Sequence, residues 1–246
     1  MSNTAKRLPI VLCLDVSNSM NSRKEGGRSA IELLNLAVKE FVESLRNDVL
    51  VKTSAEVAVI TFCEDTKTEG FKSINELEIP TLTTVKGRTH MGKAVIEAIH
   101  LIEKHREELD EMEISSYCPF LVLVTDGNPD KNDDDKLREE SIKLVRSYCD
   151  THVGAEEIIV PFVIGVGDNV DSETLNRYSE GFTSGYFPIR GTDALVAELF
   201  QEAFRFISDS ARGSIHLNEL PKQQVKTLKA DINEALQKMV NKLTAI

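Results

Sequence analysis

Four short apolar runs, separated by stretches of helical periodicity, restrict the fold of this chain more than any other feature of its sequence. They cover residues 8–14, 57–63, 120–125 and 158–167. Each run is rich in valine and isoleucine and shows no alternation of polar and apolar residues, which is typical of a strand covered on both faces.

The stretches between these runs have helical patterns. Apolar residues recur at every third or fourth position in residues 31–45, 95–102 and 137–148. Strands that alternate with helices predict an α/β fold, here a doubly wound, mostly parallel central sheet with helices on both faces.

Two weaker segments complete the predicted sheet. Residues 71–79 are polar and adjoin Pro80, so we expect them to form one short antiparallel edge strand. Residues 185–189 are expected to form a last short strand, and Thr192 then suits the N-cap of a helix over residues 194–207.

The character of the chain changes after Gly213, so we expect a main domain over residues 7–212 and an amphipathic helical extension over residues 213–246. Within residues 221–243 the apolar positions follow one another at spacings of three and four, at Val225, Leu228, Ile232, Ala235, Met239 and Leu243. Such a helix either packs on its own domain, associates with a second copy or docks on another protein. Packing on the domain is the commonest role of an amphipathic helix.

Composition excludes several partners. The chain has 246 residues and a formal net charge of -11, which disfavours binding to nucleic acid or to an anionic membrane. No apolar run approaches membrane-spanning length, and the opening residues do not form a signal peptide. The four cysteines are scattered and form no CxxC pair, so we expect neither a zinc site nor a disulfide framework, and a cytoplasmic location.

Oxygen-bearing side chains stand at the ends of the predicted strands. Asp15, Ser17 and Ser19 alternate after the first strand, Asp126 follows the third apolar run, and Thr89 directly precedes a helix. If the first and the third runs are neighbours in the sheet, these five side chains converge. Hard oxygen donors of this kind suit a small divalent cation such as Mg²⁺.

These residues resemble a known motif. Asp15-x-Ser17-x-Ser19, Thr89 with Gly92 three positions later, and Asp126-Gly127 look like the metal-ion-dependent adhesion site (MIDAS) of von Willebrand factor A domains. The similarity covers about residues 7 to 210. Within that family, the opening Leu-Pro-Ile-Val-Leu-Cys-Leu-Asp-Val-Ser-Asn-Ser-Met looks most like the bacterial TerY-like group, which is associated with tellurium-resistance gene clusters.

The resemblance implies a non-enzymatic, metal-dependent protein-interaction module. Ser17 and Ser19 would bind Mg²⁺ or Mn²⁺ directly, Thr89 directly or through water, and Asp15 and Asp126 mostly through waters. A partner protein would complete the coordination with an aspartate or glutamate. It further implies a bacterial stress, tellurite-resistance or defence setting, with kinase- or phosphatase-like partners from the same gene cluster.

Two other functions remain open. In a phosphatase of the haloacid-dehalogenase type Asp15 would be the nucleophile, but Ser17 then stands where a second aspartate is needed. Alternatively, the chain is a scaffold that self-associates through residues 221–243.

Several further residues have plainer interpretations. We expect His90 to be exposed at a helix start, Asp133–Asp135 to be a solvated acidic run, and Gly165-x-Gly167 to be a turn that ends a strand. Asn18 stands where many relatives have glycine, and asparagine tolerates a positive φ better than most residues.

Overall fold

A computed structural model describes residues 6–21, 27–126, 135–149, 158–168, 170–216 and 221–244. Its strands form one sheet in the order β3-β2-β1-β4-β5-β6. They are β1 (Leu8–Asp15), β2 (Ala55–Phe62), β3 (Thr66–Ser73), β4 (Phe120–Thr125), β5 (Val160–Val166) and β6 (Phe187–Ile189).

The sheet is parallel except at one edge. β1 pairs in parallel with both β2 and β4, β5 pairs in parallel with β4 and β6, and β3 runs antiparallel to β2. Every residue of β1, β4 and β5 is buried, as expected for strands with helices on both faces. The predicted fold class is therefore confirmed, including the antiparallel edge strand.

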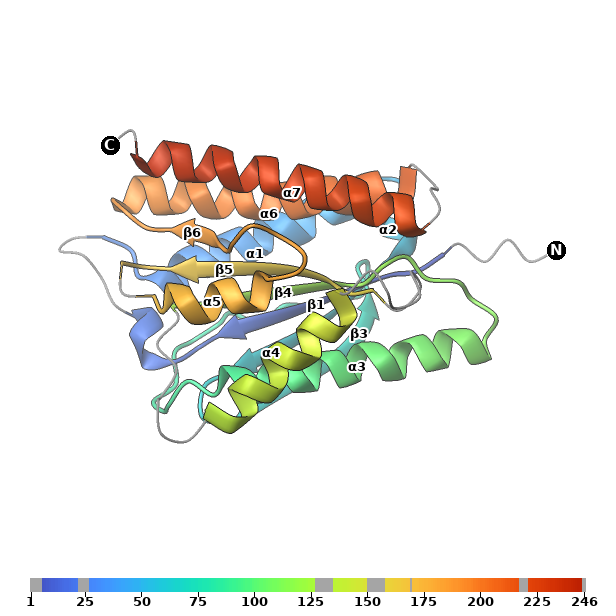
Figure 1. Cartoon of the computed structure of the whole chain (residues 1–246), viewed down its shortest axis with the longest axis horizontal. Coiled ribbons are helices and arrows are strands. Elements are labelled where there is room, and N and C mark those ends of the chain that lie inside the picture. Colours follow the sequence, from blue (N-terminus) through green and yellow to red (C-terminus); the bar gives the residue numbers. More distant parts are fainter. Residues whose placement is uncertain are drawn as a thin grey trace.

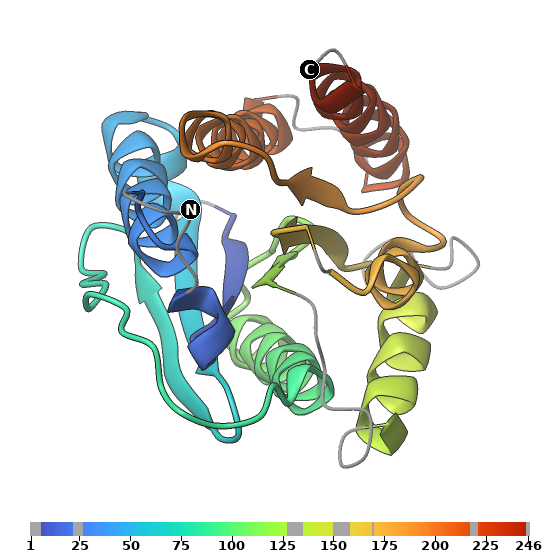
Figure 2. The same ribbon diagram turned by 90° about the vertical axis from the view of Figure 1, so that its left-hand side faces the viewer.

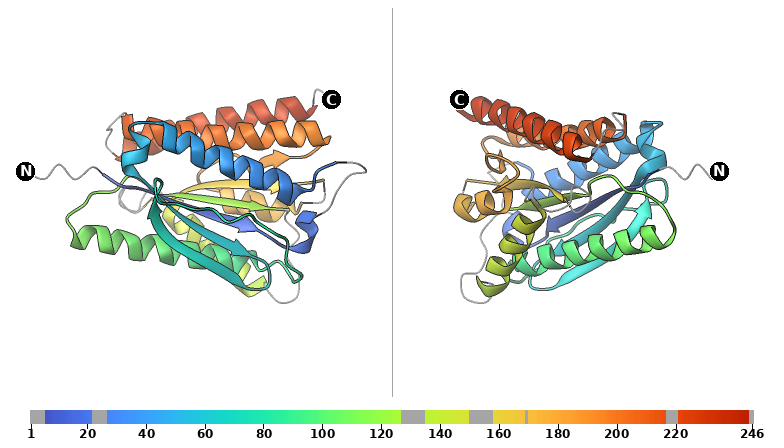
Figure 3. Two further views of the ribbon diagram at one scale, coloured as in Figure 1. Left: turned by 180° about the vertical axis from the view of Figure 1, so that it is seen from behind. Right: turned by 45° about the vertical axis from the view of Figure 1, so that its right-hand side comes forward.

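Helices form a layer on each face of the sheet, as Figure 2 shows end-on. α1 and α6 cover one face, while α3, α4 and α5 lie on the other (Figures 1 and 3). The helical segments are η1 (Asn18–Asn21), α1 (Ala30–Asn47), α2 (Val51–Ser54), α3 (Met91–Glu111), α4 (Asp135–Cys149), α5 (Ser172–Ser179), α6 (Asp193–His216) and α7 (Pro221–Thr244). No helix in the described part of the chain is both long enough and apolar enough to cross a membrane.

The start of α1 is fixed by a local hydrogen-bond pattern. The Glu32 carboxylate accepts hydrogen bonds from the backbone N–H of Ser29, at 2.8 Å, and from the Ser29 hydroxyl, at 2.9 Å. This capping arrangement occupies polar groups that a helix start leaves without partners, and so determines where the helix begins.

The edge strand lies earlier in the chain than residues 71–79. β3 ends at Ser73, because residues 63–65 turn β2 directly back into a hairpin whose second strand begins at Thr66. Beyond β3, α1 holds the chain instead: the Arg46 guanidinium donates to the carbonyls of Ile74 and Leu77. The segment near Pro80 is thus an extended strap and not a strand.

The C-terminal helix packs on the domain. α6 continues to His216, so the expected boundary at residue 213 falls within it, and α7 then runs beside α6 and against β6. The residues of α7 that join the core are Leu228, Ile232, Leu236 and Met239. Asn233 accepts a hydrogen bond from the backbone N–H of Ser184 at 2.6 Å, and Lys229 donates to the Gly181 carbonyl at 2.7 Å. Of the three roles considered for this helix, the structure shows intramolecular packing.

Candidate metal site

Asp15 is the last residue of β1 and is completely buried at the carboxyl end of the sheet. Its Oδ1 atom accepts a hydrogen bond from the backbone N–H of Ser17 at 2.8 Å, and its Oδ2 atom accepts one from the Thr125 hydroxyl at 2.6 Å. Both carboxylate oxygens are therefore held in place, one by the turn after β1 and the other by the end of the neighbouring strand β4.

The serine hydroxyls lie next to this carboxylate. The Oγ atoms of Ser17 and Ser19 are 2.9 Å apart and share a hydrogen bond. Ser17 is buried and Ser19 is exposed, so the pair lies at the surface of the domain. Adjacent ligands of an octahedral Mg²⁺ at about 2.0–2.1 Å are separated by roughly 2.9 Å. The hydroxyl pair therefore matches the spacing that such a cation requires.

The turn that presents Ser19 is the short helical segment η1, which begins at Asn18. The backbone N–H of Met20 donates to the Ser17 carbonyl at 3.1 Å, and the Met20 side chain is fully buried. Asn18 does not have a positive φ, so this turn makes no use of the tolerance of asparagine for that conformation. The buried methionine thus anchors a tight turn with ordinary backbone angles.

Asp126 follows β4 and lies close enough to Asp15 to affect its ionisation. The pKa of Asp15 is raised from 3.8 to about 6: burial raises it most and the negative charge of Asp126 also raises it, while the hydrogen bonds from Thr125 and Ser17 oppose the shift. Two neighbouring carboxylates in a buried position repel each other, and a bound cation would offset that repulsion.

The segment that carries Thr89 is tied to the same strand ends. The backbone N–H of Val85 donates to the Val16 carbonyl at 2.7 Å, and that of His90 donates to the Cys63 carbonyl at 2.8 Å. Thr89 lies between these two anchors and is buried. Asp15, Ser17 and Ser19 are thus joined by hydrogen bonds, whereas Thr89 reaches this edge of the sheet through its neighbours.

A side-chain amide on α1 holds the beginning of the same segment. Asn35 donates from Nδ2 to the Leu82 carbonyl at 2.9 Å and accepts at Oδ1 from the Leu82 N–H at 2.7 Å. The amide therefore pairs with the backbone as a neighbouring strand would, although residues 74–84 belong to no strand.

Gly92 is required by a close approach of two helices. A Cβ atom at this position would lie 2.5 Å from the backbone nitrogen of Arg138 and 2.6 Å from the carbonyl carbon of Leu137. The first turn of α3, directly after Thr89, therefore packs against the first turn of α4, directly after the loop that follows Asp126.

The sequence prediction missed one residue of the site and misjudged another. Thr125 is a hydroxyl in an otherwise apolar strand, beside Asp15 in the sheet, and that polar position was the available signal. His90 is half-buried, not exposed, because its backbone is tied to Cys63.

The structure describes the remaining motifs only in part. Gly167 has a φ of 103° and ends β5, as expected. Gly127, Asp133 and Asp134 lie outside the described residues, while Asp135 begins α4 and forms an ion pair with Arg138 at 2.5 Å.

The candidate donor set is rich in hydroxyls, with Ser17, Ser19 and Thr89. Within the residues that the structure describes, no cluster of three or more histidine, cysteine or carboxylate side chains forms a metal site. A divalent cation at this edge of the sheet would therefore depend on serine and threonine oxygens, with Asp15 and Asp126 supplying the charge. Such hard, mostly neutral donors fit Mg²⁺ and similar ions.

Comparison with known proteins assigns the family. The model of the von Willebrand factor type A domain matches residues 10–203, so the chain belongs to the von Willebrand factor type A domain family. No curated protein matches the chain significantly.

Solved structures with this fold include proteins from bacteria and from a mussel. The PilB minor pilin from Streptococcus sanguinis is 14% identical with a TM-score of 0.59, over 89% of this chain and 64% of the pilin. Proximal thread matrix protein 1 from the mussel byssus, solved with a zinc-occupied MIDAS motif, is 17% identical with a TM-score of 0.53, over 85% of this chain and 47% of that protein. The pilus adhesin SpaC from Lactobacillus rhamnosus GG is 12% identical with a TM-score of 0.58, over 85% of this chain and 31% of the adhesin. The chain thus spans less than two thirds of each of these proteins.

Proposed function

We propose that this protein is a non-enzymatic module that binds a partner protein through a divalent cation, Mg²⁺ or Mn²⁺. The cation would be held by Asp15, Ser17, Ser19, Thr89 and Asp126. The observation that carries the proposal is the pair of serine oxygens 2.9 Å apart beside a buried, doubly hydrogen-bonded carboxylate. The fold family and the zinc-occupied MIDAS motif of the byssus protein support it.

The chemistry of the donors favours interaction over catalysis. Hydroxyl ligands are neutral, so they leave most of the cation's charge uncompensated, and a bound cation then attracts a further anionic oxygen. Because Ser19 is exposed, that oxygen can come from outside the protein. An aspartate or glutamate of the partner is the expected ligand, and the pilin and pilus-adhesin neighbours agree with a role in attachment.

Apolar side chains next to the site suit a protein partner. Val85 forms a backbone bridge with Ser17 yet is 48% exposed, and Leu137, beside Gly92 at the start of α4, is 37% exposed. A protein surface that supplies the carboxylate would cover these two side chains, which a free carboxylic acid would leave in water.

The phosphatase alternative is disfavoured by the position of Asp15. A nucleophilic carboxylate needs an accessible oxygen, but Asp15 is fully buried and both of its oxygens accept hydrogen bonds. Ser17 also occupies the position where that mechanism requires a second aspartate.

Isothermal titration with MgCl₂ tests the site. We expect Ser17→Ala to weaken Mg²⁺ binding by at least tenfold, because one of the two paired oxygens is lost. Ser147→Ala is the matched control, since its hydroxyl is exposed on α4 and donates a hydrogen bond to the Leu144 carbonyl of the same helix. Equal Mg²⁺ affinity in the two variants would contradict the proposal.

A pull-down from the native host, with and without EDTA, tests the partner. Proteins that are retained by the wild type, and lost with EDTA or with Ser17→Ala, are metal-dependent partners. If the same proteins are retained with EDTA and by Ser17→Ala, the interaction does not depend on the cation and the proposal is contradicted.

The finer parts of the expected function stay predictions. They are the TerY-like grouping, a stress, tellurite-resistance or defence setting, kinase- or phosphatase-like partners, self-association through residues 221–243 and a cytoplasmic location. The identity of the captured proteins tests the first three of these directly.

A further inference from the structure

A short exposed loop of residues 86–88 borders the candidate metal site. The residue before this loop, Val85, forms a parallel backbone bridge with Ser17, and the residue after it is the buried Thr89. Adjacent strands lie about 4.8 Å apart and consecutive Cα atoms about 3.8 Å apart, so the Cα atom of Lys86 lies within roughly 9 Å of that of Ser17. Lys86 is thus one residue removed from the direct neighbour of a candidate metal ligand.

Contacts with the domain fix the course of this loop. Its two ends are held by the backbone hydrogen bonds that Val85 and His90 donate to residues directly after β1 and β2. In its middle, a Cβ atom at Gly87 would lie 3.0 Å from the Cβ atom of Glu64 and 3.4 Å from the Glu64 backbone nitrogen. The loop therefore packs directly on the turn after β2, and the backbone that carries Lys86 is held at the metal edge of the sheet.

The ammonium group of Lys86 is not bound by another side chain. Lys86 is exposed, and within the described part of the chain it takes part in no ion pair or hydrogen bond. Arg88 is exposed as well but is engaged in another interaction. The exposed Glu64 packs on Gly87 and forms no ion pair with Lys86. Lys86 thus offers a positive charge on a loop of fixed position.

The carboxylates in two adjoining turns are already paired. Asp65, after β2, forms an ion pair with Lys93 at 3.3 Å, and Asp135, at the start of α4, forms one with Arg138 at 2.5 Å. These carboxylates are therefore occupied by other basic side chains and not by Lys86. When a cation is bound, the metal and Lys86 are two positive centres a short distance apart, on a chain whose formal net charge is -11.

We propose that Lys86 selects partner segments with two carboxylates, one bound to the cation and the other paired with Lys86. The inference rests on the proposed metal-dependent function and specifies the kind of partner that the site takes. In an extended segment, residues two positions apart point to the same face and are roughly 7 Å apart, comparable to the distance between Ser17 and Lys86. An acidic segment with the pattern Asp-x-Asp, or its glutamate equivalent, is therefore the expected ligand.

The overall charge of the chain predicts the opposite preference. At a net charge of -11, long-range electrostatics favours a segment that carries basic residues beside the metal-bound acid. A preference for additional acid thus requires a local positive group. Because an exposed ion pair adds little affinity, Lys86 sets the preference while the cation provides most of the binding.

Fluorescence anisotropy with three labelled peptides at saturating MgCl₂ tests the proposal. Each peptide has blocked termini and the sequence Gly-X-Ala-Asp-Ala-X-Gly, in which X is aspartate, asparagine or lysine. Both flanking positions vary, so one of them can reach Lys86 in either direction of binding. We expect the wild type to bind the aspartate peptide roughly fivefold more tightly than the lysine peptide, with the asparagine peptide between them.

Reversing the charge in Lys86→Glu should reverse this order. The ratio of the affinities for the aspartate and lysine peptides should fall by roughly tenfold, because attraction at this point becomes repulsion. Lys226→Glu is the matched control, and its ratio should stay within about twofold of the wild type. Lys226 is also exposed and without an ion pair in the described residues, and it lies in the second turn of α7, which begins at the end of the sheet opposite the metal site (Figure 1). Urea unfolding checks that both variants are folded.

Equal affinity for the three peptides, or a preference that Lys86→Glu leaves unchanged, would overturn the proposal. In that case, binding of the asparagine peptide that is lost with EDTA and in Ser17→Ala would still support the metal-dependent function. Binding that is unaffected by EDTA, or undetectable for all three peptides, would contradict both. The two failures are therefore distinguishable.

Discussion

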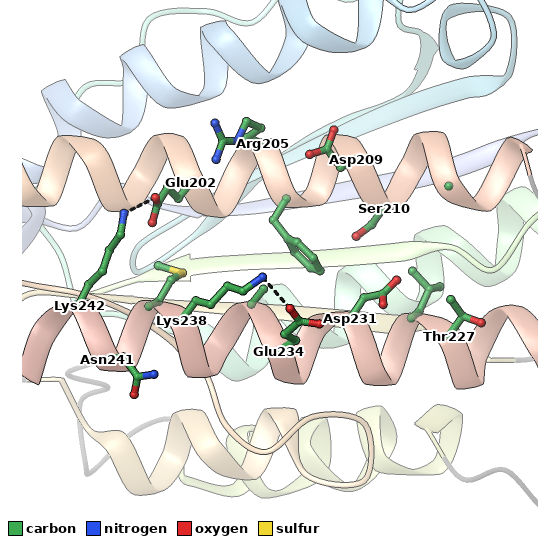
Figure 4. A pocket seen from close by; sticks show the side chains of 15 residues that line it. Glu202, Arg205, Asp209, Ser210, Thr227, Asp231, Glu234, Lys238, Asn241 and Lys242 are labelled. Atoms are coloured by element: carbon green, nitrogen blue, oxygen red, sulfur yellow. Dashed lines mark hydrogen bonds and ion pairs between the residues drawn. The ribbon is translucent and has the colours of Figure 1, made fainter.

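The carboxyl end of the sheet and the groove between α6 and α7 (Figure 4) differ in what they bury and what they leave in water. At the sheet end, Asp15 is taken completely out of water and each of its oxygens is given a hydrogen-bond donor. Along the groove, apolar groups such as Phe206 stay partly in water while charged groups line the walls. The first region holds a buried charge in a fixed position, whereas the second leaves apolar surface partly in water. Substitutions in the two regions should therefore change stability in different directions.

The largest effect is expected where α7 meets the core. Ile232 is fully buried, so Ile232→Ala should lower the free energy of unfolding by about 2–5 kcal/mol through lost burial and a cavity. Val240→Ala, at a side chain that is 40% exposed, should change it by less than about 0.5 kcal/mol. Urea unfolding measures both variants. An unaltered midpoint in Ile232→Ala would mean that α7 is a detached tail.

At the metal end the expected change has the opposite sign. Without metal at pH 7.5, Asp15→Asn should raise the free energy of unfolding by about 2–3 kcal/mol, because the pKa of Asp15 is raised to about 6 and the buried carboxylate is ionised at a cost. Asparagine keeps an acceptor for Ser17 and a group that pairs with Thr125.

The pH dependence of this effect follows from linkage. Between pH 3.8 and about 6 the folded protein retains a proton that the unfolded chain releases, so this group lowers stability progressively as pH rises through that window. The advantage of Asp15→Asn should vanish below pH 3.8. MgCl₂ should stabilise the wild type but not the variant, and a variant less stable than the metal-free wild type at pH 7.5 would contradict this account.

Gly92→Ala should be destabilising by about 1–3 kcal/mol despite the better helix propensity of alanine. Its Cβ would lie 2.5 Å from a backbone atom of α4, so α3 and α4 must separate. The same movement displaces Thr89, so the affinity for Mg²⁺ should fall as well. Calorimetric titration and urea unfolding of this one variant measure both effects. An unchanged affinity for Mg²⁺ would contradict a role for Thr89 in the site.

The smallest effect is expected at the other helical glycine. Gly213→Ala should raise the free energy of unfolding by about 0.5–1 kcal/mol, because its Cβ has open space and alanine favours the helix. Thermal unfolding resolves a change of this size. A loss of stability would show that Gly213 is closely packed.

The sheet and the placement of the candidate ligands at its edge could be predicted from sequence, because apolar runs and the polar residues that end them are local features of the chain. Residues 8–14 had to be a buried strand, and parallel pairing with β4 then brings Asp15 and Asp126 to one edge. The path of residues 74–84, which precede Thr89, could not be predicted in this way. It depends on Asn35 and Arg46, which are ordinary polar positions on an amphipathic helix until the structure places a backbone beside them.

The C-terminal helix α7 shows a second limit of prediction from sequence. Spacings of three and four predicted a helix at residues 221–243, but the same pattern fits a domain, a copy or a partner as the surface it covers. Only the three-dimensional positions of β6 and α6 decide between these. The groove depends further on which face of α6 remains uncovered, which no periodicity reveals.

The two outermost strands bear on how the protein behaves at high concentration. β3 presents Lys67 and Lys72 to solvent, and β6 is three residues long with α7 lying against it. Neither margin offers a long, uncharged row of free amides on which another chain could add a strand. A version shortened before residue 221 would bare the β6 margin together with its apolar surroundings, and association into strand-linked chains is then the expected consequence.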